Sequence, residues 1–146
     1  MVTGLWRSAN DHQEDAAAMQ YGTFEDLEVY RAARQYRKKI YALARKLPEF
    51  EKYNLAGQMR RAALSLTNCI AEGHGRFHYQ ENIQYLRQSR GSLSELLDDI
   101  NTCIDESYDE PGTLNTLKEE GYSLIKQLNG YIKYLRSCKQ AASESS

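Results

Sequence analysis

Apolar side chains recur every three or four residues in four separate segments of this 146-residue chain. At about 100° per residue, this spacing places them on one face of an α-helix. The stripe of the first segment consists of Val29, Ala33, Tyr36, Ile40, Ala44 and Leu47. No segment shows the polar–apolar alternation of a half-buried strand. The sequence therefore predicts an all-α fold in which four helices bury their stripes against one another.

Capping residues and helix breakers give approximate limits for these helices. Thr23 and Asp26 form a capping-box pattern at the start of the first helix, and Pro48 ends it. Asn54 is a favourable N-cap for the second helix, and Pro111 suits the first turn of the fourth. The predicted helices span residues 23–47, 55–73, 77–106 and 111–138. Their short connections predict an antiparallel, up-down-up-down four-helix bundle.

The chain is expected to be one domain between two polar ends. Residues 1–22 are polar and lack a sustained amphipathic period, and residues 139–146 are polar or small, so both are interpreted as flexible tails. Residues 23–138 contain no internal repeat and no stretch that looks like a linker. We therefore predict a single four-helix bundle domain over residues 23–138.

Several sequence features favour a cytoplasmic protein. No apolar run approaches the ~18 residues needed to span a bilayer, and the first twenty residues lack the basic and apolar regions of a signal peptide. Cys69, Cys103 and Cys138 form no C-x-x-C pair, so we expect reduced thiols that pack as small apolar side chains. The net charge of −1 argues against a protein that coats nucleic acid over its whole surface, but it leaves room for a local basic patch.

The second predicted helix is apolar on two faces. One face supplies core residues such as Met59 and Leu66. The residues that then point away from the core are Ala56, Ala63, Leu64 and Ala71. Because a large exposed apolar patch is uncommon on a monomer, these four are candidate contacts of a homo-oligomer. The alternative is that the N-terminal tail or the first helix covers them.

The first predicted helix carries a candidate nucleic-acid-binding surface opposite its apolar face. It consists of Arg31, Arg34, Lys38 and Arg45, which lie within ~60° of one another and are called the basic stripe below. Arg37 lies at its edge beside Tyr30 and Tyr41. Cations edged by aromatic rings suit phosphate contacts and base stacking. The alternative is an ordinary solvated helix face, which such charge runs usually are.

The sequence offers no catalytic, metal or cofactor site. His74 and His78 straddle a glycine turn without a carboxylate at ligand spacing, so no metal site is predicted. The stretch from Gly73 to Arg76 lacks the Lys-Ser/Thr and the preceding strand of a phosphate-binding loop. No nucleophile–base set can be proposed either. We therefore expect a protein that is not an enzyme and uses no cofactor.

Three motifs resemble those of the bacterial four helix bundle protein family, also called the 23S ribosomal RNA intervening-sequence protein family. The family pattern reads Q-x-R-R-A-A, then N-I-A-E-G-x-G-R, then G-S-x-x-E-L. The matching positions are Gln58, Arg60, Arg61, Ala62 and Ala63, then Asn68, Ala71, Glu72, Gly73, Gly75 and Arg76, then Gly91, Ser92, Glu95 and Leu96, with Cys69 in place of the usual isoleucine.

The resemblance covers about residues 23–138 and implies a four-helix bundle that often assembles as a ring-shaped homopentamer. More distantly, the chain is similar to accessory proteins of diversity-generating retroelements, which are pentamers that engage nucleic acid and a reverse transcriptase. The partners that the resemblance implies are therefore other copies of the chain, RNA or DNA, and a partner protein such as a reverse transcriptase.

The charges of the matched motifs have two interpretations. They are Arg60, Arg61, Glu72, Arg76 and Glu95, called the family-motif charges below. Arginine forks pair bidentately with carboxylates, so these residues are expected to lock the second helix to the third around the glycine turn. The alternative is that the arginines hold phosphates. Two functions therefore remain open: an oligomer that binds nucleic acid through the basic stripe, or a structural adapter that binds a partner protein.

Overall fold

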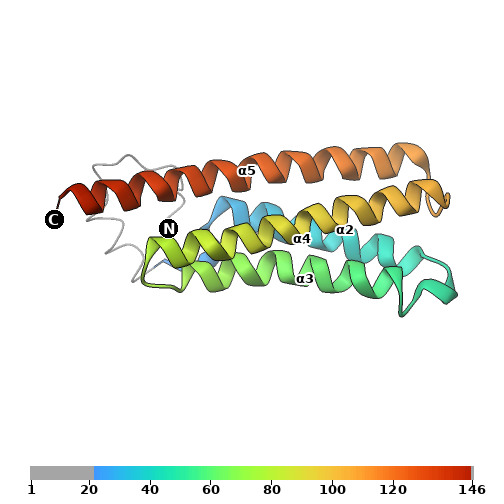
Figure 1. The fold of residues 1–146 in the computed structure, drawn as a ribbon. Helices are drawn as coiled ribbons and strands as arrows, with labels where there is room; N and C mark the ends of the chain where they lie inside the picture. The colour runs from blue at the N-terminus through green and yellow to red at the C-terminus, as the bar shows by residue number, and fades with distance from the viewer. Residues whose placement is uncertain (1–21, 146) are drawn as a thin grey trace.

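The computed structural model describes residues 22–145. Within that range the chain forms four α-helices, two short 3₁₀ helices and no strand. The α-helices are α2 (Glu28–Lys46), α3 (Leu55–His74), α4 (Tyr79–Asp105) and α5 (Pro111–Glu144), and the 3₁₀ helices are η2 (Phe24–Asp26) and η3 (Glu49–Glu51). Figure 1 shows the α-helices packed side by side, with the α3–α4 connection at one end and the other two connections at the opposite end. The predicted all-α fold is confirmed.

The apolar stripes form the core, as predicted. Every residue of the first stripe is buried, and so are most of the corresponding residues of the other three helices. The largest fully buried side chains are Ile40, Met59, Leu66, Ile70, Ile83, Leu86, Leu93, Leu96, Ile100, Leu114, Leu128 and Ile132. Cys69, Cys103 and Cys138 are buried with them.

The capping box at Thr23 is present, but it starts a 3₁₀ turn and not the long helix. The Thr23 hydroxyl accepts the Glu25 backbone N–H at 3.2 Å, and the Asp26 carboxylate accepts the Thr23 backbone N–H at 3.3 Å. Leu27 then adopts an extended conformation, and α2 begins at Glu28. The first helix is therefore divided where the sequence predicted one continuous element.

The α2–α3 turn is held by a buried carboxylate. Glu51 is 7% exposed and accepts the Tyr108 hydroxyl at 2.7 Å, the Asn54 side-chain amide at 3.0 Å and the Leu55 backbone N–H at 3.4 Å. These hydrogen bonds lower the pKa of Glu51, and the hydrogen bond from the Tyr108 hydroxyl has the largest effect. Since Tyr108 follows α4, Glu51 fastens the α2–α3 turn to the α4–α5 turn.

Close packing joins α3 to α4. A Cβ on Gly73 would lie 2.7 Å from the Asn82 side-chain oxygen and 2.9 Å from the Tyr85 Cβ, so only glycine fits there. The Ser89 hydroxyl, which is fully buried, donates to the Leu66 carbonyl at 2.6 Å. These contacts fix α4 against α3 along their shared length.

Helix α4 ends in a Schellman motif. The Tyr108 N–H donates to the Cys103 carbonyl at 2.9 Å, and the Ser107 N–H donates to the Ile104 carbonyl at 3.1 Å. Ser107 has a φ of 56°, the left-handed conformation that this motif requires and that glycine usually supplies.

Helix α5 is longer than predicted. The prediction of a flexible tail over residues 139–146 is wrong for residues 139–144, which continue α5. Buried Cys138 keeps the preceding turn on the core, and Lys139 donates to the Gln80 side chain at 2.6 Å. Figure 1 shows α5 extending beyond the end where α3 and α4 join. The other predicted tail, residues 1–22, lies outside the described residues except for Gly22. No helix of residues 22–145 is long and apolar enough to cross a membrane.

Candidate nucleic-acid interface

The structure places the basic stripe on the outer side of α2. Its four members, Arg31, Arg34, Lys38 and Arg45, are all exposed, whereas the apolar stripe of the same helix faces the core. The predicted separation of a charged face from a buried face is therefore present. The individual cations differ, however, in what they contact.

Two of the predicted cations are engaged within the chain. The Arg31 guanidinium lies 3.6 Å from the Asp26 carboxylate and donates to the Glu25 carbonyl at 3.0 Å. Arg37 is half-buried, and its guanidinium donates to the Thr67 hydroxyl of α3 at 2.7 Å. Arg37 therefore ties α2 to α3 and is not a free member of the surface.

The other three cations, Arg34, Lys38 and Arg45, have no ion pair with another residue of the range 22–145. They lie within ~40° of one another around α2 and span about 16 Å along it. Two neighbouring lysines show the contrast: Lys39 pairs with Glu120, and Lys46 pairs with Asp109 at 3.2 Å. The outer face of α2 thus keeps uncompensated positive charge, while its side towards α5 is neutralised.

The aromatic residues expected beside the stripe are only partly available. Tyr30 and Tyr41 are half-buried against the core, and Tyr30 also packs edge-on against Phe24 with the ring centroids 4.8 Å apart. Two strongly exposed rings lie in the α2–α3 turn, where Phe50 is 76% and Tyr53 85% exposed. Sequence reasoning missed them because they belong to neither helical stripe. Their position between a helix-ending proline and an N-cap asparagine was the available signal.

One family-motif arginine contacts both α3 and α4. The Arg76 guanidinium lies 3.7 Å from the Glu72 carboxylate and 3.9 Å from that of Glu81 at the start of α4. It also donates to the Tyr85 hydroxyl at 2.6 Å and lies over that ring, 4.9 Å from its centroid. Arg76 therefore contacts residues of both α3 and α4, and Glu72 is its partner on α3.

The remaining family-motif charges lack the expected carboxylate pairing. The Arg60 guanidinium donates to the Lys52 carbonyl at 2.9 Å, and Arg61 and Glu95 are exposed. Within the described part of the chain, none of these three takes part in an ion pair. A Cβ on Gly57 would lie 3.3 Å from the Arg61 guanidinium and 3.9 Å from that of Arg60, so the two cationic groups converge there.

The predicted oligomer contacts divide into two pairs. Ala56 is 1% exposed and Ala63 is fully buried, so the prediction that they point away from a single core is wrong. Helix α3 packs against both α2 and α4, and these two residues belong to the shared hydrophobic core. Leu64 is 44% exposed and Ala71 is half-buried, so these two remain accessible for self-association.

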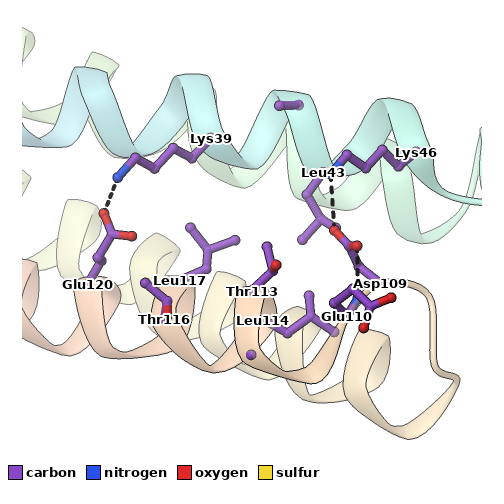
Figure 2. A pocket seen from close by; sticks show the side chains of 12 residues that line it. Lys39, Leu43, Lys46, Asp109, Glu110, Thr113, Leu114, Thr116, Leu117 and Glu120 are labelled. Carbon is purple, nitrogen blue, oxygen red and sulfur yellow. Dashed lines mark hydrogen bonds and ion pairs between the residues drawn. The ribbon is translucent and has the colours of Figure 1, made fainter.

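A groove with a volume of about 710 Å³ lies between α2 and α5. Figure 2 shows the two ion pairs, Lys39–Glu120 and Lys46–Asp109, crossing it at either end, with the apolar side chains of Leu43, Leu114 and Leu117 between them. The hydrogen bond from the Glu110 backbone N–H lowers the pKa of Asp109 most, and the hydrogen bond and charge of Lys46 lower it further. Both lysines of the groove are therefore paired with carboxylates, unlike Arg34, Lys38 and Arg45 on the outer face of α2.

Two titratable groups buried in α4 lie one helical turn apart. Burial, together with the nearby Glu95 and Asp98 carboxylates, raises the pKa of Asp99 to about 6. Burial and Asp99 raise the pKa of the Cys103 thiol to about 11. A thiol kept protonated is a poor nucleophile, so Cys103 fits the role of a core residue.

Comparison with known proteins places the chain in a family. A search among curated proteins finds no match. The sequence model described as 23S rRNA-intervening sequence protein matches residues 25–130, from the first 3₁₀ turn into α5. This match covers all or part of every helix that the structure describes. The chain therefore belongs to the 23S rRNA-intervening sequence protein family.

Proposed function

We propose that this protein is a non-enzymatic homo-oligomer that binds RNA or DNA through the basic stripe of α2. The observation that carries the proposal is the set Arg34, Lys38 and Arg45. These cations share one exposed face and lack an acidic partner among residues 22–145. Phosphates supply the missing counter-charge, and such contacts dominate nucleic-acid affinity.

The assembly is part of the same proposal. We infer an up-down-up-down bundle, which the placement of the three connections in Figure 1 supports, in a cytoplasmic ring of identical subunits. Exposed Leu64 is the apolar contact, and a ring would repeat the basic stripe around its circumference. Repetition lets several weak contacts act together on one strand, which raises the apparent affinity.

The binding test compares two triple variants of equal charge. Replacing Arg34, Lys38 and Arg45 by alanine removes three positive charges from α2. The control variant replaces Lys126, Lys133 and Arg136 of α5, which are also exposed. The α5 set is the weaker candidate because exposed Glu119, seven residues before Lys126, lies on the same helix face.

The α2 variant should bind labelled RNA and DNA at least tenfold more weakly in fluorescence anisotropy, whereas the control should change little. Binding by the parent protein should fall steeply with salt, by roughly 0.9 log units per log unit of salt for each duplex phosphate contacted. Equal loss in both variants would move the site away from α2. No binding even at low salt would favour the adapter function, in which the protein binds a partner protein.

Self-association is tested by Leu64→Glu, which places a carboxylate in the proposed contact. The mass measured by light scattering after size-exclusion chromatography should shift towards that of a monomer. Gln84→Glu, an equally charged change at an exposed position of α4, is the control. A parent protein that is already monomeric at micromolar concentration would refute the ring.

A further inference from the structure

We infer that the α2–α3 turn is a site for single-stranded nucleic acid, where Arg60 and Arg61 hold a phosphate and Tyr53 stacks on an unpaired base. The inference rests on the proposed function and adds the type of strand that is bound. It comes from the two observations that the helical stripes leave unexplained: exposed aromatic rings and converging guanidinium groups at one end of the bundle.

The aromatic rings are displayed by a fixed turn. Three backbone hydrogen bonds join residues that are three apart in this turn. The Glu51, Lys52 and Asn54 N–H groups donate to the carbonyls of Pro48, Glu49 and Glu51, at 2.9 Å, 3.1 Å and 3.0 Å respectively. Phe50 lies in the 3₁₀ helix η3, and Tyr53 lies in the turn that follows it, before α3 begins. The Phe50 ring leans on Tyr108 with centroids 6.5 Å apart, whereas Tyr53 is 85% exposed. Buried Glu51 holds the turn in place beneath them, so Tyr53 is presented on a rigid support.

Positive charge gathers beside the same ring. The Lys52 ammonium lies over the Tyr53 ring, 5.4 Å from its centroid, and the Lys52 carbonyl accepts the Arg60 guanidinium at 2.9 Å. The Arg60 and Arg61 guanidinium groups both approach within 4 Å of the position that a Gly57 Cβ would occupy. Glycine at this position leaves the space into which both groups reach.

Two neighbouring guanidinium groups repel each other unless an anion lies between them. Inside the range 22–145, Lys52 has a partner in Glu49 at 3.9 Å, but neither arginine has a carboxylate. A phosphate fits this arrangement because guanidinium groups bind phosphate oxygens bidentately. Arg45 lies three residues before Pro48, so the basic stripe leads directly to this end of the bundle.

The exposed ring selects the strand type. In a duplex each base is already stacked on its neighbours, whereas an unpaired base offers a free face to an aromatic side chain. A phosphate held by the arginines places the attached base next to the turn that carries Tyr53. The turn should therefore favour single strands over duplexes.

The experiment measures binding of fluorescent single-stranded RNA and DNA, and of duplexes of the same length, by anisotropy. The variants are Tyr53→Ala and Tyr53→Phe, and the control is Tyr122→Ala, which removes another exposed tyrosine, 52% exposed, from α5. An abasic oligonucleotide provides the phosphates without the bases. Circular dichroism checks that each variant is folded, as expected for a side chain this exposed.

Tyr53→Ala should weaken single-strand binding by about 5- to 150-fold, the range for loss of one base–aromatic stack. Tyr53→Phe and Tyr122→Ala should bind as the parent does, and Tyr53→Ala should leave abasic binding unchanged. Equal effects of Tyr53→Ala and Tyr122→Ala, or equal affinity of the parent for duplex and single strand, would overturn the inference while leaving the proposed function intact. No binding by the parent would refute both, and a Tyr53→Ala variant that lost only self-association would assign the ring to a protein contact.

Discussion

Replacing Gly121 by alanine should destabilise the bundle, because α5 has no room for a methyl group there. A Cβ at this position would lie 2.6 Å from the Tyr36 hydroxyl and 2.7 Å from a Leu97 methyl group. Tyr36 cannot move freely, since it is 3% exposed and its hydroxyl donates to the Leu117 carbonyl at 2.9 Å. This contact seats α2 on α5 and so orients the basic stripe.

The expected magnitude follows from three terms. Overpacking a core position costs about 1–3 kcal/mol, and a buried hydroxyl that loses its partner costs a further ~1–3 kcal/mol. Alanine recovers about 1 kcal/mol over glycine through its higher helix propensity. The three terms together give a net loss of about 1–5 kcal/mol, and its midpoint corresponds to roughly 10 °C in melting temperature for a domain of this size.

Thermal and urea unfolding followed by circular dichroism, at a single protein concentration, measures this loss. Gly91→Ala is the matched control, because α4 leaves open space within 4 Å of a Cβ at that position. It should stabilise the protein by roughly 0.5–1 kcal/mol through helix propensity alone. In a Tyr36→Phe background, which lacks the hydroxyl, Gly121→Ala should cost at least 1 kcal/mol less than in the parent. The reasoning is refuted if Gly121→Ala is as stable as the parent or if its cost is equal in the two backgrounds.

Three further substitutions test the turns and the buried acid. Ser107→Gly should stabilise the protein by about 1 kcal/mol in urea unfolding, because glycine adopts the left-handed φ of 56° without strain; a less stable variant would contradict this. Asp99→Asn should stabilise the protein by roughly 1–2 kcal/mol at pH 7.5 and hardly at all near pH 4. The reason is that a carboxyl whose pKa is raised to about 6 contributes stability at low pH, and this contribution is lost as the pH rises. A gain that does not depend on pH would rule this out. Tyr108→Phe should lower the melting temperature at neutral pH, because the hydroxyl that it removes donates to the ionised Glu51 carboxylate. The difference in melting temperature from the parent should shrink as the pH falls through the lowered pKa of Glu51. An undiminished difference in acid would show that Tyr108 acts through packing alone.

The sequence predicted the core well because burial follows helical periodicity. The residues of the first stripe, from Val29 to Leu47, are all buried, as are Leu114 and Leu128 on α5. An apolar repeat of three to four residues depends only on the local geometry of the helix and on the general tendency of apolar side chains to be buried. The end of α5 was missed because Lys139 and its neighbours are polar, and what holds that turn is a contact with Gln80 on another helix.

The orientation of α3 could not be obtained in the same way. A single stripe assumes one core direction, whereas α3 packs against both α2 and α4, and this is why Ala56 and Ala63 are buried without a second subunit. The candidate site also depended on side-chain partners. Arg37 and Arg34 have the same charge on the same helix, yet only Arg37 reaches a hydroxyl on α3. Spacing within one helix does not contain that information.

The three cysteines give the bundle built-in probes of its local opening. Cys69, Cys103 and Cys138 lie on α3, α4 and α5 respectively, and they are 8%, 0% and 2% exposed. A thiol reagent can reach each one only when its own helix separates from the others, so the labelling rate of each cysteine reports the free energy of that separation. Three similar rates would mean that the bundle opens as one cooperative unit. Faster labelling of Cys138 would mean that the extended end of α5 detaches first, while the α3–α4 pair stays closed.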